Sequence, residues 1–302
     1  MPPNASDASG SSPRDVPAPT GVGRTALMVA AARAAESRRD DRLFTDPYAA
    51  DFVAAGGVDF FTGDPAPPEG AADRASGSFA DYAPIRTRFF DDYLRATAGT
   101  IRQVVIVAAG LDTRAFRLGL AAETTVYELD SAEVLTFKQG VLDRRGAQPT
   151  GRRVPVPTDL RGPWDGALAE AGFDPEIPAA WLIEGLLPYL EPEQNDRLLT
   201  AVTAQSAAGS RLAIEFLHVD AVALMTQALA GADAGEMTSL WTRGGVDEDP
   251  DSWLRRHGWD PEPFDVYERA RSYHRDLPPL GDTPVDRFAE AARNSLIIAR
   301  RS

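Results

Sequence analysis

Hydrophobic residues in the middle of this chain form short continuous runs, and most of these runs are separated by segments of helical periodicity. Val104 to Val107 is a β-branched run of the kind found in a central strand that is covered on both faces. Strands are predicted at 103–109, 124–129, 153–157, 181–184, 210–216 and 294–299. Such alternation predicts an α/β fold in which right-handed crossovers join a mostly parallel sheet.

Two helices are predicted before the first strand. Residues 25–39 are dense in good helix formers and end in two arginines, which suit the negative end of a helix. Asp46 is expected to cap a second helix that has Pro47 in its first turn. A loop rich in proline and glycine follows at 63–77.

A third helix is indicated by Ile85, Phe89 and Tyr93, which fall at positions i, i+4 and i+8. We expect this helix to pack its aromatic residues inward and to direct Arg86 and Arg88 elsewhere. Further helices are predicted at 113–121, 131–145 and 192–207.

The chain divides into a tail and one domain. Residues 1–20 are rich in proline, serine, alanine and aspartate, so we expect a disordered tail. Residues 21–302 are expected to form a single domain. Its predicted parts are a helical segment at 21–98, a core at 99–218 and 261–302, and a helix-prone insertion at 219–260.

The composition is that of an ordinary globular protein, and the charge argues against polyanionic partners. The 302 residues are 43% hydrophobic, and the net charge is −14. No lysine or arginine block could bind a row of phosphates, so nucleic acid and anionic membranes are poor partners. No apolar run approaches the roughly 18 residues that span a bilayer, and no signal-peptide core is visible. We therefore expect a cytoplasmic protein. The sequence does not indicate its oligomeric state, and the partner expected from the reaction considered below is a small-molecule acceptor.

Cysteine is absent, which excludes disulfides, thiolate catalysis and cysteine-ligated metal sites. The three histidines, His218, His257 and His274, lack the i, i+4 spacing that places two of them on one helical face. We therefore expect no metal site.

The first strand runs into a glycine turn, which is typical of a cofactor site. Gly110 can adopt a backbone conformation that is costly for other residues, and Asp112 or Thr113 can cap the next helix. Ala108 and Thr113 stand where a dinucleotide fingerprint would have glycines. A cofactor without a pyrophosphate therefore fits this turn better.

Asp130 follows the second strand, 20 residues after Gly110. A carboxylate at this position can accept both hydroxyl protons of a ribose, which favours a nucleoside-bearing cofactor. The alternative is that Asp130 caps the helix at 131–145, with Glu133 completing a capping box. One carboxylate can serve both purposes.

Other polar residues follow the third and fourth strands. Asp159 could accept from an adenine amino group while Leu160 packs on the ring, or Asp159 could simply stabilise a turn. Glu184 ends an apolar run, where an unpaired carboxylate would be costly to bury. Arg88 and Arg33 are the candidate cations, since arginine can hold a carboxylate with two hydrogen bonds.

Several motifs occur in the order found in a known family. They are RTALMVAAARAAESRRDDRLFTDPYAADF, RTRFFDDYL, VVIVAAGLDTRAFRL, VYELDSAEVLTFK, VPTDL, WLIEGLLPYL and GSRLAIEF. Over residues 21–216 and the last strand, the chain resembles the leucine carboxyl methyltransferase superfamily, and in particular its actinobacterial branch. The resemblance fades over 219–280.

This resemblance implies a class I methyltransferase fold, with a Rossmann-like sheet of seven strands and a helical lid at 21–98. It also implies S-adenosylmethionine as cofactor. The implied cofactor contacts are Arg88 on the methionine carboxylate, Gly110 at the turn, Asp130 on the ribose, Asp159 and Leu160 on the adenine, and Glu184 on the methionine amino group. Arg33 matches a basic residue of the family in the first helix.

The expected reaction is methylation of an oxygen atom on a small molecule, with the insertion at 219–260 shaping the acceptor site. A carboxylate acceptor needs no general base, whereas a hydroxyl usually does. His218 could be that base and Tyr189 could orient the acceptor, although a histidine in the core or facing solvent is the plainer interpretation. Two other hypotheses are an NAD-dependent oxidoreductase and a catalytically silent binder of adenosyl ligands.

Overall fold

The structure is a computed structural model, and it describes residues 17–57, 71–97, 99–229 and 244–302. Most of the predicted tail therefore lies outside the described residues. Thr20, at the end of that tail, is attached to the domain, because its backbone N–H donates to Glu133 Oε1 at 2.9 Å.

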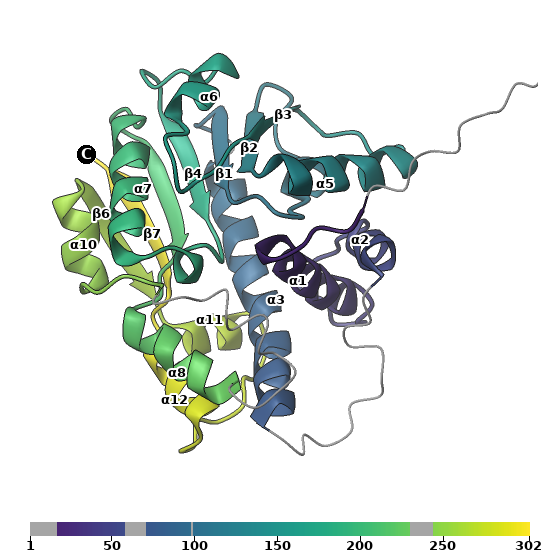
Figure 1. The fold of residues 1–302 in the computed structure, drawn as a ribbon, viewed down its shortest axis with the longest axis vertical. Coiled ribbons are helices and arrows are strands. Elements are labelled where there is room, and N and C mark those ends of the chain that lie inside the picture. The colour runs from purple at the N-terminus through teal and green to yellow at the C-terminus, as the bar shows by residue number, and fades with distance from the viewer. Residues whose placement is uncertain (1–16, 58–70, 98, 230–243) are drawn as a thin grey trace, which may run out of the picture.

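A seven-stranded sheet in the order β3-β2-β1-β4-β5-β7-β6 forms the centre of the molecule (Figure 1). The first five strands are parallel, and β7 runs antiparallel to both β5 and β6. The strands are β1 Gln103–Val107, β2 Thr125–Asp130, β3 Arg152–Pro157, β4 Ala179–Ile183, β5 Arg211–Glu215, β6 Trp259–Phe264 and β7 Leu296–Arg301. All six predicted strands are present, with ends shifted by a few residues.

Helices cover both faces of the sheet (Figure 1). The N-terminal helices are α1 Val22–Ser37, α2 Ala49–Gly56 and α3 Ala71–Thr97. The crossover helices are α4 Arg114–Arg117, α5 Ala132–Arg144, α6 Asp165–Glu170 and α7 Pro192–Ala204, with a 3₁₀ turn at Leu187–Tyr189. The later helices are α8 Val219–Leu229, α10 Pro250–Arg256, α11 Val266–Ser272 and α12 Pro284–Ala291.

The alternation of side chains along β1 divides the core between the two faces. Val105 and Val107 pack with residues of α6, α7 and α10. Val104 and Ile106 pack with residues of α1, α2, α3, α5 and α11. All four side chains are buried, as the β-branched run predicts.

Several local predictions were wrong. The helix predicted at 113–121 is reduced to the four residues of α4. Asp46 is not the N-cap of α2, which is Tyr48. The Oδ2 of Asp46 accepts from Arg33 and Thr113, and its Oδ1 accepts from the Tyr48 N–H in the turn before the helix. The predicted loop at 63–77 lies partly outside the described residues, and α3 already begins at Ala71.

The region after β5 also differs from its predicted outline. The edge strand β6 begins before the predicted end of the insertion at 260, and it contains Pro261 and Pro263. An edge strand tolerates proline because one side of it needs no backbone donor.

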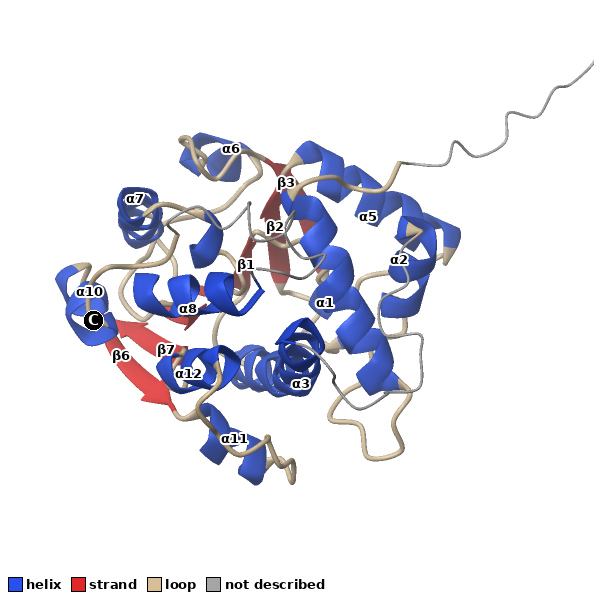
Figure 2. Cartoon of the chain, turned by 60° about the horizontal axis from the view of Figure 1, so that its bottom comes forward, coloured by secondary structure: helices blue, strands red, loops and turns tan. Residues whose placement is uncertain are grey.

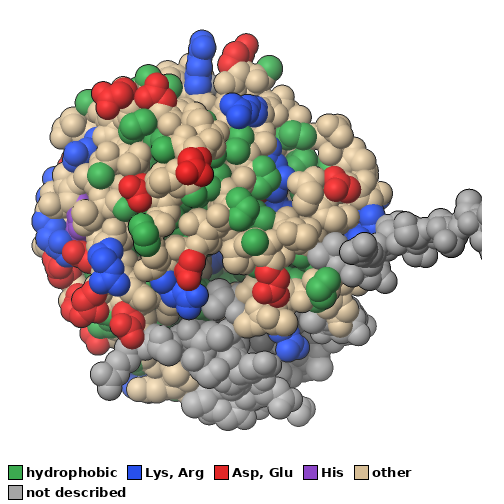
Figure 3. All heavy atoms as spheres, turned by 45° about the horizontal axis from the view of Figure 1, so that its top comes forward, with side chains coloured by type: hydrophobic (Ala, Val, Ile, Leu, Met, Phe, Trp, Pro, Cys, Tyr) green, Lys and Arg blue, Asp and Glu red, His purple; other side chains and the backbone are tan. Residues whose placement is uncertain are grey.

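On the face drawn in Figure 3, acidic and basic side chains stand close together rather than in separate regions. No helix within the described ranges combines the length and hydropathy needed to cross a membrane.

Candidate functional site

A cavity of about 850 Å³ lies at the carboxyl ends of the parallel strands. Residues that follow each of β1 to β5 line it, as expected for the ligand site of an open α/β sheet. Residues of α1, α3, α8 and α12 complete the lining. Figure 2 brings these helices forward, and they gather around one end of the sheet.

The turn after β1 brings Gly110 against Asp130. Gly110 has φ +45°, and its N–H donates to Asp130 Oδ2 at 2.7 Å. A Cβ at position 110 would lie 3.3 Å from the Cβ of Ala26 in α1. Ala108 also has a positive φ, of 54°, although a side chain disfavours this conformation. The turn is therefore tightly constrained on the side that faces the cavity.

Asp130 lines the cavity and does not cap α5. Ser131 is the N-cap, and its backbone N–H donates to Asp130 Oδ1 at 2.7 Å. Burial raises the pKa of Asp130, and the two backbone donors only partly oppose that effect. Since Glu133 is bonded to Thr20, the alternative capping box is not formed at Asp130.

Asp159 and Leu160 line the cavity from the loop after β3. The Asp159 carboxylate accepts from the backbone N–H of Arg161 at 3.0 Å and from its guanidinium at 2.9 Å. Hydrogen bonding to Arg161 lowers the pKa of Asp159. Asp159 therefore stabilises a turn and lines the cavity at the same time.

Glu184 follows β4 and lies between two arginines. Its oxygens are 2.8 Å from Arg86 Nε and 2.8 Å from Arg114 Nη1. Burial alone would raise the pKa of this carboxyl, but the positive charges of Arg114 and Arg86 outweigh burial, and the pKa is lowered. Glu184 is thus an ionised group with the partners that a buried carboxylate requires.

Arg86 reaches the cavity, and Arg88 does not. Arg86 is 5% exposed, and its Nη1 donates to both oxygens of Glu215 at 2.8 and 3.0 Å. Its Nε forms the ion pair with Glu184, but the Nε–H makes no hydrogen bond with any residue in the described ranges. Arg88 instead binds Asp92, packs over the ring of Tyr273 and is not among the described residues that line the cavity.

The structure therefore corrects the prediction for these two arginines. Successive helical residues are about 100° apart, so Arg88 lies about 200° around α3 from Arg86. Arg86 falls on the buried side of α3 with Phe89 and Phe90, whereas we expected it elsewhere. The helical spacing could have identified Arg86 as the inward cation.

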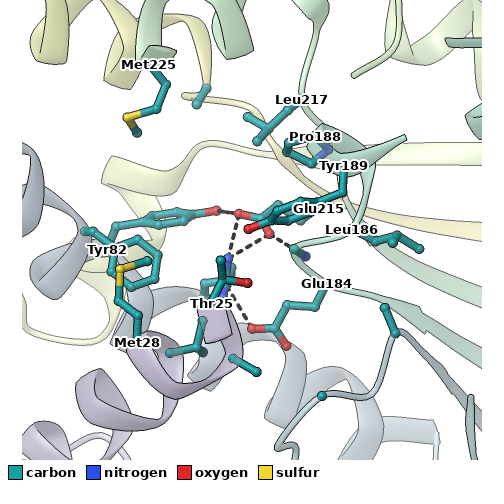
Figure 4. A pocket seen from close by; sticks show the side chains of 18 of the residues that line it. Thr25, Met28, Tyr82, Glu184, Leu186, Pro188, Tyr189, Glu215, Leu217 and Met225 are labelled. Carbon is teal, nitrogen blue, oxygen red and sulfur yellow. Dashed lines mark hydrogen bonds and ion pairs between the residues drawn. The ribbon is translucent and has the colours of Figure 1, made fainter. Parts of the chain in front are cut away.

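Glu215 and Tyr82 are site residues that the sequence analysis missed. Glu215, at the end of β5, accepts from Tyr82 Oη at 2.8 Å and from the Gly185 N–H at 2.8 Å, in addition to Arg86 (Figure 4). Burial, and next the negative charge of Glu215, raise the pKa of Tyr82, which therefore stays protonated. An acidic residue closing the apolar run LAIE was the available signal.

The remaining candidates differ in their positions. Arg33 lines the cavity but is already bonded to Asp46 at 2.9 Å and to the Leu111 carbonyl at 2.6 Å, so it holds the turn after β1 in place.

Of the two predicted catalytic residues, Tyr189 lines the cavity (Figure 4). His218 is half-buried outside the described lining, and its Nδ1 accepts from the Asp220 N–H at 3.2 Å. The structure thus does not bring the predicted base, His218, to the site.

Known proteins resemble this chain in sequence and in fold. Residues 26–203 match the family described as Leucine carboxyl methyltransferase. A Mycolicibacterium smegmatis protein, provisionally named S-adenosyl-L-methionine-dependent methyltransferase, is 44% identical over 89% of this chain and 91% of its own. A similarly named protein of Frankia alni is 47% identical over 80% of this chain and 84% of its own.

A solved structure shares the architecture. The crystal structure of a DUF574 family protein from Streptomyces avermitilis superposes with a TM-score of 0.56 at 16% identity. The match covers 92% of this chain and 97% of that chain. The predicted class I methyltransferase fold is confirmed. By the family match and the close relatives, this chain belongs to the leucine carboxyl methyltransferase family.

Proposed function

We propose that this protein transfers a methyl group from S-adenosylmethionine to an oxygen atom of a small molecule, with a carboxylate favoured over a hydroxyl. Family membership and the names of the relatives make it an S-adenosylmethionine-dependent methyltransferase. The oxygen acceptor is the part that we add. The expectation of an NAD-dependent oxidoreductase is not retained.

One observation carries this proposal. Gly110, Asp130, Glu184 and Arg86 lie along a single edge of the cavity, at the ends of three adjacent strands and on the helix α3 beside them. This arrangement matches the order of charges in the cofactor. The Asp130 carboxylate would accept from the ribose hydroxyls, with Asp159 and Leu160 beside the adenine.

The methionine end of the cofactor fits Glu184 and Arg86. Glu184 is ionised and would accept from the ammonium group, while Arg86 would donate to the carboxylate in place of Arg88. The Nε–H of Arg86 lies in an ion pair with Glu184 but is not hydrogen-bonded to it, so it is a buried donor to which such a carboxylate could bind. These contacts are our proposal for the binding of the cofactor.

When bound, S-adenosylmethionine supplies an electrophilic methyl group whose sulfur retains the bonding electrons. The chain must then align the acceptor and exclude water. Tyr82 keeps its proton and donates it to Glu215 in a hydrogen bond, so Tyr82 cannot act as a base toward the acceptor. Glu215 already accepts hydrogen bonds from Tyr82, Arg86 and Gly185, so its oxygens are occupied by donors of the protein itself. This pair therefore favours an acceptor that is ionised before it binds.

Two measurements test the proposal in sequence. A thermal-shift titration compares S-adenosylmethionine, S-adenosylhomocysteine and NAD, and saturation at 100 times the Kd should stabilise the protein by about 2.7 kcal/mol. Labelled methyl transfer is then measured with matched carboxylic acids and phenols. We expect a shift with the adenosyl ligands and faster transfer to the acids. Binding without any transfer would favour a catalytically silent protein and contradict the proposal.

A further inference from the structure

The cavity extends beyond the charged edge of the sheet into a region of different character. We call this region the apolar chamber and define it by Leu217, Val222, Met225, Leu280, Val285 and Phe288, all of which line the cavity. In Figure 4, Leu217 and Met225 lie on the opposite side of the Tyr82–Glu215 pair from Glu184. The pair thus marks the boundary between the two parts.

The sequence of α12 explains one wall of the chamber. Val285, Phe288, Ala289 and Ala292 fall at i, i+3, i+4 and i+7, and all four line the cavity. An amphipathic helix normally turns such a stripe toward the protein core. Here the stripe borders the cavity, and Phe288 is only half-buried.

Helix α8 supplies the facing wall and packs against α12. Val222 and Met225 are three residues apart on α8, so both lie on the side that lines the cavity. Ala223, between them in sequence, is exposed. The two helices therefore present apolar surface to one space.

A chamber of this kind binds apolar surface in preference to water. Burial of apolar area is the main favourable contribution to binding in such pockets. Sites for small molecules usually enclose about 300–1,000 Å³. The volume of this cavity, about 850 Å³, is near the upper end of that range.

We infer that the methyl acceptor is a lipophilic small molecule with an aromatic or alkyl body, which the apolar chamber binds while its oxygen lies at the Tyr82–Glu215 pair. This inference rests on the proposed function. It adds the substrate class, and it assigns α8 and α12 as the elements that select the acceptor.

The test measures binding of 4-alkylbenzoates to the protein saturated with S-adenosylhomocysteine, by titration calorimetry. Each added methylene should raise the affinity roughly fourfold until the chamber is filled. Met225→Asp and Phe288→Asp should each weaken binding of the longest bound member at least tenfold. Ala223→Asp introduces the same charge on the exposed side of α8 and should leave the affinity unchanged.

The outcomes separate this inference from the proposed function. Affinity that does not depend on chain length, or equal losses in Met225→Asp and Ala223→Asp, would overturn the apolar acceptor. Unchanged affinity for S-adenosylhomocysteine confirms that each variant is folded. If Met225→Asp fails this check, Met225→Gln replaces it and should still weaken the longest benzoate more than the shortest. Failure of the unsubstituted protein to bind S-adenosylhomocysteine would reject the proposed function itself.

Discussion

The two parts of the cavity are built in different ways. At the sheet edge, Arg86, Glu184 and Glu215 are buried or nearly so and are joined in ion pairs. In the apolar chamber, Met225 and Phe288 are half-buried on helices. The sheet edge carries charged groups on strand ends and on the long helix α3, whereas the apolar chamber offers hydrophobic contacts.

This difference has an energetic consequence. A buried charge that loses its partner costs several kcal/mol, whereas hydrophobic exchanges of similar volume usually cost less than about 1.5 kcal/mol. The charged edge therefore tolerates little change, while the apolar chamber can be reshaped cheaply. We expect cofactor binding to depend on the first part and acceptor choice on the second.

The largest expected effect is that of Arg86→Met. Removing this guanidinium leaves Glu184 with only Arg114 and deprives Glu215 of its cationic partner. Breaking a buried ion pair in this way should lower the free energy of unfolding by about 3–5 kcal/mol. Urea denaturation at neutral pH measures the loss.

Arg88→Met is the matched control for that variant. Its partner Asp92 is partly exposed, so the loss should stay below about 1 kcal/mol. Equal losses in the two variants would show that the charged edge is no more constrained than the surface.

Asp130→Asn tests the cofactor contact at the same edge. A hydrogen bond to a charged group contributes about 1.5–3 kcal/mol, so the affinity for S-adenosylhomocysteine should fall by about ten- to a hundredfold. Asp165→Asn, an exposed change at the start of α6, is the control. Titration calorimetry compares the two, and equal affinities would remove Asp130 from the site.

The pH dependence of binding should reveal the same carboxyl group. Burial raises the pKa of Asp130, so on acidification it is protonated before an ordinary aspartate and ceases to accept from two hydroxyl groups. Affinity for S-adenosylhomocysteine should therefore begin to fall above the usual aspartate range. The same shift affects stability. Protonated Asp130 stabilises the folded protein at pH values below the pKa that this group has in the unfolded chain, and this stabilisation is lost as the pH rises through its pKa in the folded protein. In Asp130→Asn the acid-side fall in affinity should be reduced.

A smaller effect is expected from Gly110→Ala. The φ of +45° disfavours a side chain, and the new Cβ would approach Ala26, so stability should fall by about 1–2 kcal/mol. Gly166→Ala has open space within α6 and should instead stabilise by about 0.5–1 kcal/mol. Thermal unfolding distinguishes these opposite signs, and stabilisation by both would mean that the turn is unconstrained.

The smallest effect should come from Met225→Leu in the apolar chamber. The side chains are similar in volume, so stability should change by less than about 1.5 kcal/mol. Affinity for S-adenosylhomocysteine should not change, while the ranking of 4-alkylbenzoates should shift. A large loss of cofactor affinity would contradict the division into two parts.

Much of this fold follows from local patterns in the sequence. The β-branched run ending at Val107 predicted the central strand, and the residues after the strands predicted which strand ends border a ligand. Gly110, Asp130 and Glu184 line the cavity because parallel strands end at a common edge. Backbone topology alone is enough to bring these residues together.

The choice of ion-pair partners depends on tertiary geometry. Glu184 was expected to need a cation, but its partners come from α3 and from Arg114 after β1, far apart in the chain. The helical spacing on α3 could have identified Arg86, but the identity of Glu215 as its second partner required the position of β5. His218 follows the correct strand but lies outside the described lining, because the direction of a side chain after a strand is not fixed by its place in sequence.

A guanidinium shared by two carboxylates also limits the order in which residues can change. Replacing Arg86 alone leaves two buried acids poorly compensated, and replacing either acid alone leaves the arginine with excess charge. The costs of single substitutions therefore cannot be added, and a joint replacement should cost less than their sum. Substitutions at Arg86, Glu184 and Glu215 are therefore coupled. If the three residues are replaced one at a time, the intermediate proteins should be less stable than the starting protein.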